Sequence, residues 1–200
     1  MDTNRDYPRL LVGELFGAVE RIEGWLTHLE QMALLHLPLF VDHLSGDIVE
    51  IGSFKGKSTV SLGLGSKWLS GQKRKVYAID PFMPDVWHYR APYFEDFKRN
   101  IQSSGLEDYV IPINKPSYEA LDQCPERICG LFVDGDHSYI GVKRDIQLYT
   151  PRVIDGGMVA FHDYSVYADV ARAVDELCDS GDYVYVGDYD SLRLLRKIKK

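Results

Sequence analysis

Residues 47–62 read DIVEIGSFKGKSTVSL and place an acid, two glycines and a helix start in close succession. Glu50 lies in an apolar run that ends at Gly52, and Gly56 precedes Ser58 at the start of a second apolar series. This order predicts a buried strand, a glycine turn and a helix. Free backbone N–H groups at the start of such a helix attract a negatively charged group. The stretch therefore predicts a ligand-binding turn.

The rest of the chain continues this alternation of strand and helix. Further strands are expected at KVYAID (75–80), YVIPI (109–113), ICGLFVD (128–134) and GMVAFHD (157–163). Helices are expected at 57–69, 93–101, from 117, at 138–148 and at 166–177. Short apolar strands that alternate with helices predict an α/β fold with a doubly wound, mainly parallel sheet and helices on both faces. The segment DYVYVGDYDSLRLLRKI (182–198) instead predicts two antiparallel strands around a turn at 187–191.

The first 44 residues follow a different pattern. Apolar residues at positions 15, 16, 19, 22, 26, 29 and 33 recur at helical spacing and predict one amphipathic helix over 10–36, before Pro38. We interpret residues 1–44 as a helical appendage and residues 45–200 as a Rossmann-like domain. The helix could cover a cofactor, form a homodimer surface or pack as ordinary core.

Composition narrows the class of partner. The 200 residues are 45% apolar and 26% charged, with a net charge of −7, which argues against nucleic acid as the main partner. Three cysteines without a CxxC pair suggest neither a disulfide framework nor a zinc site, and they favour a cytoplasmic setting. No apolar run reaches the ~18 residues that a membrane span needs, so no membrane partner is expected.

The glycine turn matches neither of two common phosphate-binding motifs. Counted from Gly52, a GxGxxG dinucleotide motif would have its second and third glycines where Phe54 and Lys57 stand. A P-loop would need its first glycine where Ile51 stands. Asp80 nevertheless ends the second strand, where such folds hold a ribose hydroxyl, although it comes later than the usual ~20 residues after the turn.

A ligand with adenosine at one end and an amino acid at the other satisfies these constraints, and S-adenosylmethionine has that shape. This ligand also explains Glu50, because an acid near the strand end would stabilise the positively charged ammonium and sulfonium groups of the ligand. The alternative interpretation of Glu50 is a partly buried acid paired with a basic side chain or with backbone N–H groups.

The segments VEIGSFKGKST, VYAIDP, FVDGDHSYIGVKRDI and GGMVAFHDY resemble the class I S-adenosylmethionine-dependent methyltransferases. The resemblance covers residues 45 to 197 and is strongest to the small-molecule branch, which includes the catechol, caffeoyl-CoA and macrocin-type O-methyltransferases. It implies a seven-stranded sheet whose last strand is antiparallel. It also implies that Gly52, Ser53, Gly56 and Ser58 contact the methionine part, that Asp80 holds the ribose, and that Ser117 and Tyr118 border the adenine. Ser117 could also be a helix N-cap.

The chemistry is expected where the fourth and fifth strands end. FVDGDH places Asp134, Asp136 and His137 at the end of the fourth strand, with Ser138 ready to cap the next helix. His137 stands where the catechol-type enzymes carry a lysine base, and histidine titrates near neutral pH, so we expect His137 and Asp134 to be catalytic. The alternative is that His137 closes the strand by bonding backbone.

The resemblance also implies Mg²⁺ or another divalent metal, held by Asp134 and Asp163. Tyr164 stands where those relatives have a third ligand, an amide, and His162 or Asp136 could replace it. In the alternative interpretation Asp134 binds the ammonium of the cofactor and Asp163 caps a helix that starts near residue 165.

These observations predict a methyltransferase that acts on a small hydroxylated acceptor, such as a sugar or a natural-product intermediate. An aromatic segment over 81–97 could wall the acceptor or the adenine, or form a local packing cluster. Two alternatives are a nicotinamide-dependent oxidoreductase, which would share the sheet and Asp80, and a non-catalytic binding domain on the same fold.

Overall fold

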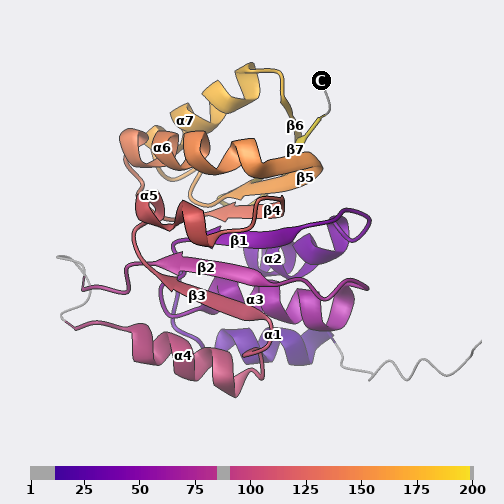
Figure 1. The fold of residues 1–200 in the computed structure, drawn as a ribbon, viewed down its shortest axis with the longest axis vertical. Helices are drawn as coiled ribbons and strands as arrows, with labels where there is room; N and C mark the ends of the chain where they lie inside the picture. The colour runs from indigo at the N-terminus through magenta and orange to yellow at the C-terminus, as the bar shows by residue number, and fades with distance from the viewer. Residues whose placement is uncertain (1–11, 85–90, 199–200) are drawn as a thin grey trace, which may run out of the picture.

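The computed structural model describes residues 12–84 and 91–198, which form a seven-stranded sheet between two layers of helices (Figure 1). The strands are β1 (Asp47–Ile51), β2 (Val76–Asp80), β3 (Val110–Asn114), β4 (Ile128–Val133), β5 (Val153–Phe161), β6 (Tyr183–Tyr189) and β7 (Leu192–Lys197). The helices are α1 (Val12–Glu20), α2 (His28–Phe40), α3 (Lys57–Leu64), α4 (Phe94–Ser103), α5 (Ser117–Ala120), α6 (Tyr139–Tyr149) and α7 (Ala168–Asp179). A short π-helix, η1 (Gly65–Leu69), follows α3. Two short 3-10 helices, η2 (Leu121–Gln123) and η3 (Thr150–Arg152), follow α5 and α6.

The strands lie in the order β3-β2-β1-β4-β5-β7-β6 along the long axis of the molecule (Figure 1). β7 runs antiparallel to both of its neighbours, and the other strand pairs are parallel. This confirms the predicted doubly wound sheet with its antiparallel last strand. The strand order reverses between β1 and β4, so a crevice for a ligand opens beyond the carboxyl ends of these two strands.

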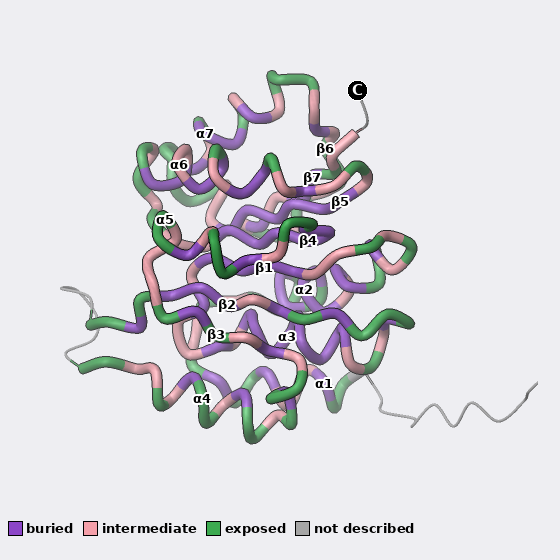
Figure 2. Tube along the Cα trace, viewed as in Figure 1, coloured by how far each residue is buried: buried purple, intermediate pink, exposed green. Residues whose placement is uncertain are grey.

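Alternate side chains of β1 enter two different cores, one on each face of the sheet. Ile48 packs with apolar residues of α1–α4, whereas Val49 and Ile51 pack with those of α5–α7. The central strands are buried along almost their whole length (Figure 2). Glu50 has the same parity as Ile48, so the pleat points its carboxylate into the core under α3.

The predicted single helix over 10–36 is wrong. Its first residues lie outside the described part of the chain, and the rest forms α1 and α2 with a break between them. Gly24 has a φ of +157°, and Thr27 caps α2 through a capping box with Glu30. α2 continues past Pro38, because a proline in the last turn removes few helical hydrogen bonds.

Several other boundaries differ from the prediction by a few residues. β5 begins at Val153, before the expected position, and α7 begins at Ala168 after a turn in which Asp163 accepts bonds from the N–H groups of Val166 and Tyr167. The final hairpin turns at residues 190–191, because β6 continues through Gly187 at a register shift.

The expected aromatic segment over 81–97 lies in part outside the described residues, which leaves out Trp87, His88 and Tyr89. In its described part, the rings of Phe82, Phe94 and Phe97 pack together with centroids 4.6–6.4 Å apart. Among the described helices, none is long and apolar enough to cross a membrane.

Candidate active site

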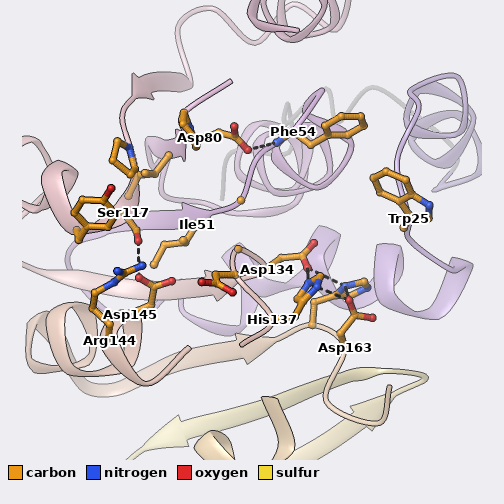
Figure 3. Close-up of a pocket in the computed structure, with 18 of the residues that line it drawn as sticks. Trp25, Ile51, Phe54, Asp80, Ser117, Asp134, His137, Arg144, Asp145 and Asp163 are labelled. Atoms are coloured by element: carbon orange, nitrogen blue, oxygen red, sulfur yellow. Dashed lines mark hydrogen bonds and ion pairs between the residues drawn. The ribbon is translucent and has the colours of Figure 1, made fainter. Parts of the chain in front are cut away.

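A cavity of about 730 Å³ opens beyond the carboxyl ends of β1, β2, β4 and β5 (Figure 3). Its lining comes from the turn after β1, the end of β2, the start of α5, the β4–α6 loop and the end of β5. Ser117 and Arg144 lie at one end in Figure 3, whereas His137, Asp163 and Trp25 lie at the other. The cavity therefore joins the predicted adenine side to the predicted catalytic side.

The two glycines of the opening turn are required by the backbone. Gly52 has a φ of +88°, and a Cβ there would lie 2.0 Å from the carbonyl oxygen of Asp134. Gly56 has a φ of +89°, and a Cβ there would lie 3.1 Å from the ring of Phe97. The turn after β1 therefore packs backbone against backbone at the loop after β4, at the point where the strand order reverses. Of the predicted methionine-side residues, Gly52 lines the cavity, whereas Ser53, Gly56 and Ser58 lie behind it.

Glu50 is fully buried beneath this turn and does not line the cavity. Its carboxylate accepts a hydrogen bond from the hydroxyl of Thr59. Burial raises the pKa of Glu50 to about 7, although the nearby hydroxyls of Ser58, Thr59 and Ser53 act in the opposite direction. The alternative interpretation, an acid paired with a basic side chain or backbone N–H groups, does not describe this arrangement, because the partners are hydroxyls.

Asp80 joins the loops that follow β1 and β2. One carboxylate oxygen accepts the N–H of Phe54 at 2.8 Å, and the other accepts the N–H of Phe82 at 2.6 Å and the hydroxyl of Tyr93 at 3.1 Å. Asp80 is 6% exposed, and burial raises its pKa. It lines the cavity, so a carboxylate lies where the ribose was predicted to bind.

Arg144 and Asp145 also line the predicted adenine side, although no sequence motif indicated a role for them. Ser117 donates from its hydroxyl to Asp145 at 2.6 Å, and the Arg144 guanidinium lies 4.4 Å from the centre of the Tyr118 ring. Burial raises the pKa of Asp145 to about 6. The alternative role of Ser117 as an N-cap is wrong, because Pro116 precedes the first turn of α5 and Ser117 already belongs to it.

The catalytic side brings two histidines and two carboxylates together. His137 Nε2 lies 3.2 Å from an Asp163 oxygen and 3.6 Å from an Asp134 oxygen. His162 Nδ1 lies 3.1 Å from the same Asp134 oxygen and 3.5 Å from Asp163. The His137 ring also stacks on Tyr167, with centroids 4.5 Å apart and planes 14° apart. The alternative that His137 only closes the strand through backbone bonds does not account for this cluster.

These contacts set the charge of the cluster. The neighbouring Asp134 carboxylate raises the pKa of His137. Burial alone would lower the pKa of His162, but the adjacent carboxylates of Asp134, Asp163 and Glu30 outweigh that effect and raise it to about 12. Burial alone would raise the pKa of Asp134, but the neighbouring His137 and His162 rings lower it.

The donors that could hold a metal ion are Asp134, His162 and Asp163, whose ligand atoms lie within 4.8 Å of one another. Two carboxylates suit Mg²⁺, and an imidazole would suit a softer divalent ion. Asp136 does not join this group, because its carboxylate accepts the N–H of Ser138 at 2.8 Å at the start of α6. The predicted cap by Ser138 is present, since its hydroxyl accepts the N–H of Gly141 at 3.2 Å.

Tyr164 is directed away from the cluster. Its hydroxyl donates to Asp175 at 2.8 Å, and the Arg193 guanidinium lies 3.6 Å from the centre of its ring. The alternative role of Asp163 as a helix cap is wrong, because Tyr167 precedes α7 and the Asp163 carboxylate faces the histidines.

Residues 49–164 match the family model of the methyltransferase domain. The chain belongs to this family. The predicted class I S-adenosylmethionine-dependent methyltransferase is thereby confirmed, and the nicotinamide-dependent oxidoreductase is not favoured. The matched residues run from β1 to just beyond β5, so they include the glycine turn and the acid–histidine cluster.

The methyltransferase also resembles an uncharacterised protein, R132, of Acanthamoeba polyphaga mimivirus, with 34% identity over 125 residues. The match covers 60% of this chain and 52% of that protein, so the chain spans about half the length of this relative.

Solved structures share the fold at low identity. The O-methyltransferase NovP has a TM-score of 0.70 at 20% identity, covering 86% of this chain and 80% of that chain. An O-methyltransferase from Bacillus cereus in complex with SAH has a TM-score of 0.65 at 12% identity, covering 94% and 90%. CalS11, a TDP-rhamnose 3'-O-methyltransferase, has a TM-score of 0.62 at 15% identity, covering 83% and 77%. These likenesses establish the Rossmann-like methyltransferase fold.

Proposed function

We propose that this methyltransferase transfers a methyl group from S-adenosylmethionine to a hydroxyl oxygen of a small acceptor molecule. The observation that carries the proposal is one cavity with Ser117 and Arg144 at one end and the acid–histidine cluster toward the other, with Asp80 between them (Figure 3). The neighbours NovP and CalS11 are O-methyltransferases by name, and the Bacillus cereus enzyme is a complex with SAH, which supports the same chemistry here.

The lining fits a cationic nucleoside better than a pyrophosphate. Five carboxylates line the cavity, and Arg144 is the only lysine or arginine among the described lining residues. The carboxylate residues are Asp80, Asp134, Asp136, Asp145 and Asp163. These carboxylates would repel the negatively charged phosphates of a dinucleotide, whereas they favour the positively charged sulfonium and ammonium groups of S-adenosylmethionine. The volume lies in the range of cofactor and small-molecule sites, about 300–1,000 Å³.

The residues then take separate roles. Asp80 would hold the ribose, Ser117 and Tyr118 would border the adenine, and Gly52 and Asp134 would contact the methionine part. Ser53, Gly56 and Ser58 would shape the turn from behind the cavity, and Glu50 would support the turn through its hydroxyl partners. The cofactor supplies a methyl group on a positively charged sulfur. The protein supplies alignment with the acceptor oxygen and removal of its proton.

His137 is the proposed base. The His137 ring lines the cavity, and its buried Nε2 lies beside Asp134 and Asp163. The two carboxylates favour the protonated ring that forms when the proton arrives. A divalent ion, if bound, would be held by Asp134 and Asp163 and would stabilise negative charge on the acceptor oxygen.

Aromatic side chains border the open end and are the proposed acceptor wall. Trp25 is 62% exposed, and its ring lies 5.3 Å from that of Phe54. Tyr167 is 44% exposed and stacks on His137. Rings of this kind present apolar faces to a flat or sugar-like acceptor. We further propose that the protein is cytoplasmic, forms a homodimer, and has no nucleic-acid or membrane partner.

Calorimetric titration with S-adenosylmethionine, S-adenosylhomocysteine and NADH tests the cofactor assignment. We expect the first two to bind and NADH not to bind. A screen of hydroxylated acceptors with labelled cofactor then tests the reaction. Binding of NADH alone would overturn the proposal, and cofactor binding without methyl transfer to any acceptor would favour a non-catalytic binding domain.

A further inference from the structure

Glu30 connects α2 to the catalytic side of the cavity. It belongs to the segment before β1, outside the residues that match the family model, and its side chain is 2% exposed. One of its oxygens, Oε2, accepts the backbone N–H of Thr27 at 2.8 Å, and Glu30 N donates to the Thr27 hydroxyl at 3.3 Å. This reciprocal pair is the capping box of α2.

The other oxygen of Glu30 is held by the turn between β6 and β7. Oε1 accepts the backbone N–H of Ser191 at 3.0 Å and the Ser191 hydroxyl at 2.6 Å. Thr27 strengthens the same junction, because its hydroxyl donates to Asp190 at 2.5 Å. Thr27 and Ser191 therefore fix the Glu30 carboxylate from two sides, independently of its contact with His162.

His162 lies between Glu30 and Asp134. Its Nε2 is 3.3 Å from Glu30 Oε2, as an ion pair rather than an aligned hydrogen bond, and its Nδ1 is 3.1 Å from Asp134 Oδ1. The ring is 5% exposed, and its backbone N–H donates to Val133 at 3.0 Å. A flip of the ring about Cβ–Cγ would exchange nitrogen for carbon at both carboxylates, so the pair of acids selects one orientation.

We infer that Glu30 is a positioning residue, which holds the His162 ring so that Nδ1 fixes the Asp134 carboxylate at the methyl-transfer end of the cavity. Glu30 does not line the cavity and acts only through His162. The inference rests on the proposed function, since that function gives Asp134 its place beside the cofactor and the acceptor. It makes α2 part of the active site rather than a dispensable appendage.

A purely structural role for Glu30 makes a different prediction. The third position of a capping box accepts glutamine as well as glutamate, so Glu30→Gln can keep the bond from Thr27 N through its amide oxygen while it removes the charge that faces His162. Its NH2 group replaces the oxygen that accepts from Ser191 N, so that one bond is lost as well. If capping were the only role, this variant would keep its activity. Gln31 supplies the matched control, because it is the next residue of α2, is 1% exposed and has no hydrogen-bond partner for its side chain among the described residues.

The test compares Glu30→Gln, Gln31→Ala and the wild type by two measurements. The first is the ring N–H signals of His162 in ¹H–¹⁵N NMR spectra, assigned with a His162→Gln variant. The second is kcat, KM for the acceptor and the Kd for S-adenosylhomocysteine. We expect Glu30→Gln to shift the Nε2–H signal or lose it to solvent exchange, and to lower kcat by about 10–100-fold, as for other residues that orient a site ligand. The Kd should stay within about twofold.

Gln31→Ala should lower the melting temperature while both His162 signals and kcat stay near those of the wild type. Ser191→Ala, which removes one donor to Glu30, provides a milder second variant and should change the same observables in the same direction. An unchanged His162 spectrum or an unchanged kcat in Glu30→Gln would overturn the inference. An equal loss of kcat in Gln31→Ala would also overturn it. If the wild type binds the cofactor but methylates no acceptor, the proposed function fails instead, and the His162 signals still decide whether Glu30 positions the ring.

Discussion

The Cα of Gly52 lies so close to the backbone of Asp134 that a Cβ at Gly52 would be 2.0 Å from the Asp134 carbonyl oxygen. Two hydrogen bonds hold the surrounding backbone, from Asp134 N to Ile51 O at 2.8 Å and from Gly52 N to Ile79 O at 2.9 Å. The turn after β1 and the loop after β4 are thus one packed unit, so a change in either is transmitted to the other.

Gly52→Ala should destabilise the fold and abolish cofactor binding. The positive φ and the backbone clash together should cost at least about 3 kcal/mol of unfolding free energy. Gly181→Ala is the matched control, because Gly181 has a φ of +73° but open space around the position of a Cβ. It should cost about 1 kcal/mol, from backbone strain alone. Urea unfolding curves of both variants measure the difference, and equal losses would contradict the clash.

His137→Ala should lose turnover and keep cofactor binding. A general base contributes about 10²–10⁴-fold to the rate, so kcat should fall by that factor while the Kd for S-adenosylhomocysteine stays near the wild-type value. His36→Ala, on the α2 surface, is the control and should leave both unchanged. Wild-type turnover in His137→Ala would exclude His137 as the base.

Trp25→Ala should weaken acceptor binding without an effect on the cofactor. Loss of an aromatic wall should raise the acceptor KM by about tenfold or more, corresponding to at least about 1.4 kcal/mol. Trp25→Phe keeps an aromatic ring and should restore most of the affinity. If the cofactor Kd rises instead of the acceptor KM, Trp25 covers the cofactor and does not contact the acceptor.

Glu50→Gln should stabilise the protein at alkaline pH. The folded-state pKa of Glu50 is raised to about 7 by burial, so its contribution to stability is fully present below the unfolded pKa near 4.5 and is lost as pH rises through 7. The neutral variant avoids this loss, and a shift of this size corresponds to about 3 kcal/mol. Thermal unfolding of both proteins between pH 4 and pH 9 should show the curves converging near pH 4.5. A constant difference across this range would contradict the raised pKa.

Removal of divalent metal tests the role of Asp134 and Asp163. If the two carboxylates hold a metal, exhaustive chelation should abolish turnover, and added Mg²⁺ or another divalent ion should restore it. Asp163→Asn should then raise the metal concentration needed for half-maximal rate by about 10–100-fold. Activity that survives chelation and does not increase with Mg²⁺ would exclude the metal.

Most of the central sheet could be predicted because periodicity and glycine placement are local signals. The turn after β1 shows this, since the need for glycine at Gly52 and the buried strand before it are both visible in sixteen residues. The N-terminal helix could not be bounded in the same way. Its apolar spacing continues across the break at residues 21–27, and this spacing outweighs the one local signal of a new helix, the capping-box pair Thr27 and Glu30.

Several charged contacts of the site could not be predicted, because they join residues far apart in the sequence that meet only in the folded protein. Glu30 and His162 are 132 positions apart and meet only because α2 packs beside the end of β5 and the turn between β6 and β7. Asp145 was missed for a similar reason, since its bond to Ser117 joins two different helices. By contrast, Asp134, His137 and Asp163 could be predicted, because residues that end neighbouring parallel strands always meet at one edge of the sheet.

The position of β7 between β5 and β6 has a consequence for synthesis on the ribosome. β6 leaves the exit tunnel first but has no partner in the sheet until β7 follows and inserts beside β5. Ser191 follows β6 in the chain, so the Glu30 carboxylate forms its bonds with Ser191 only after β1–β6 have been synthesised. A nascent chain can thus bury its central strands early, yet the end of the cavity that contains His162 gains its full set of contacts only when the β6–β7 hairpin has formed.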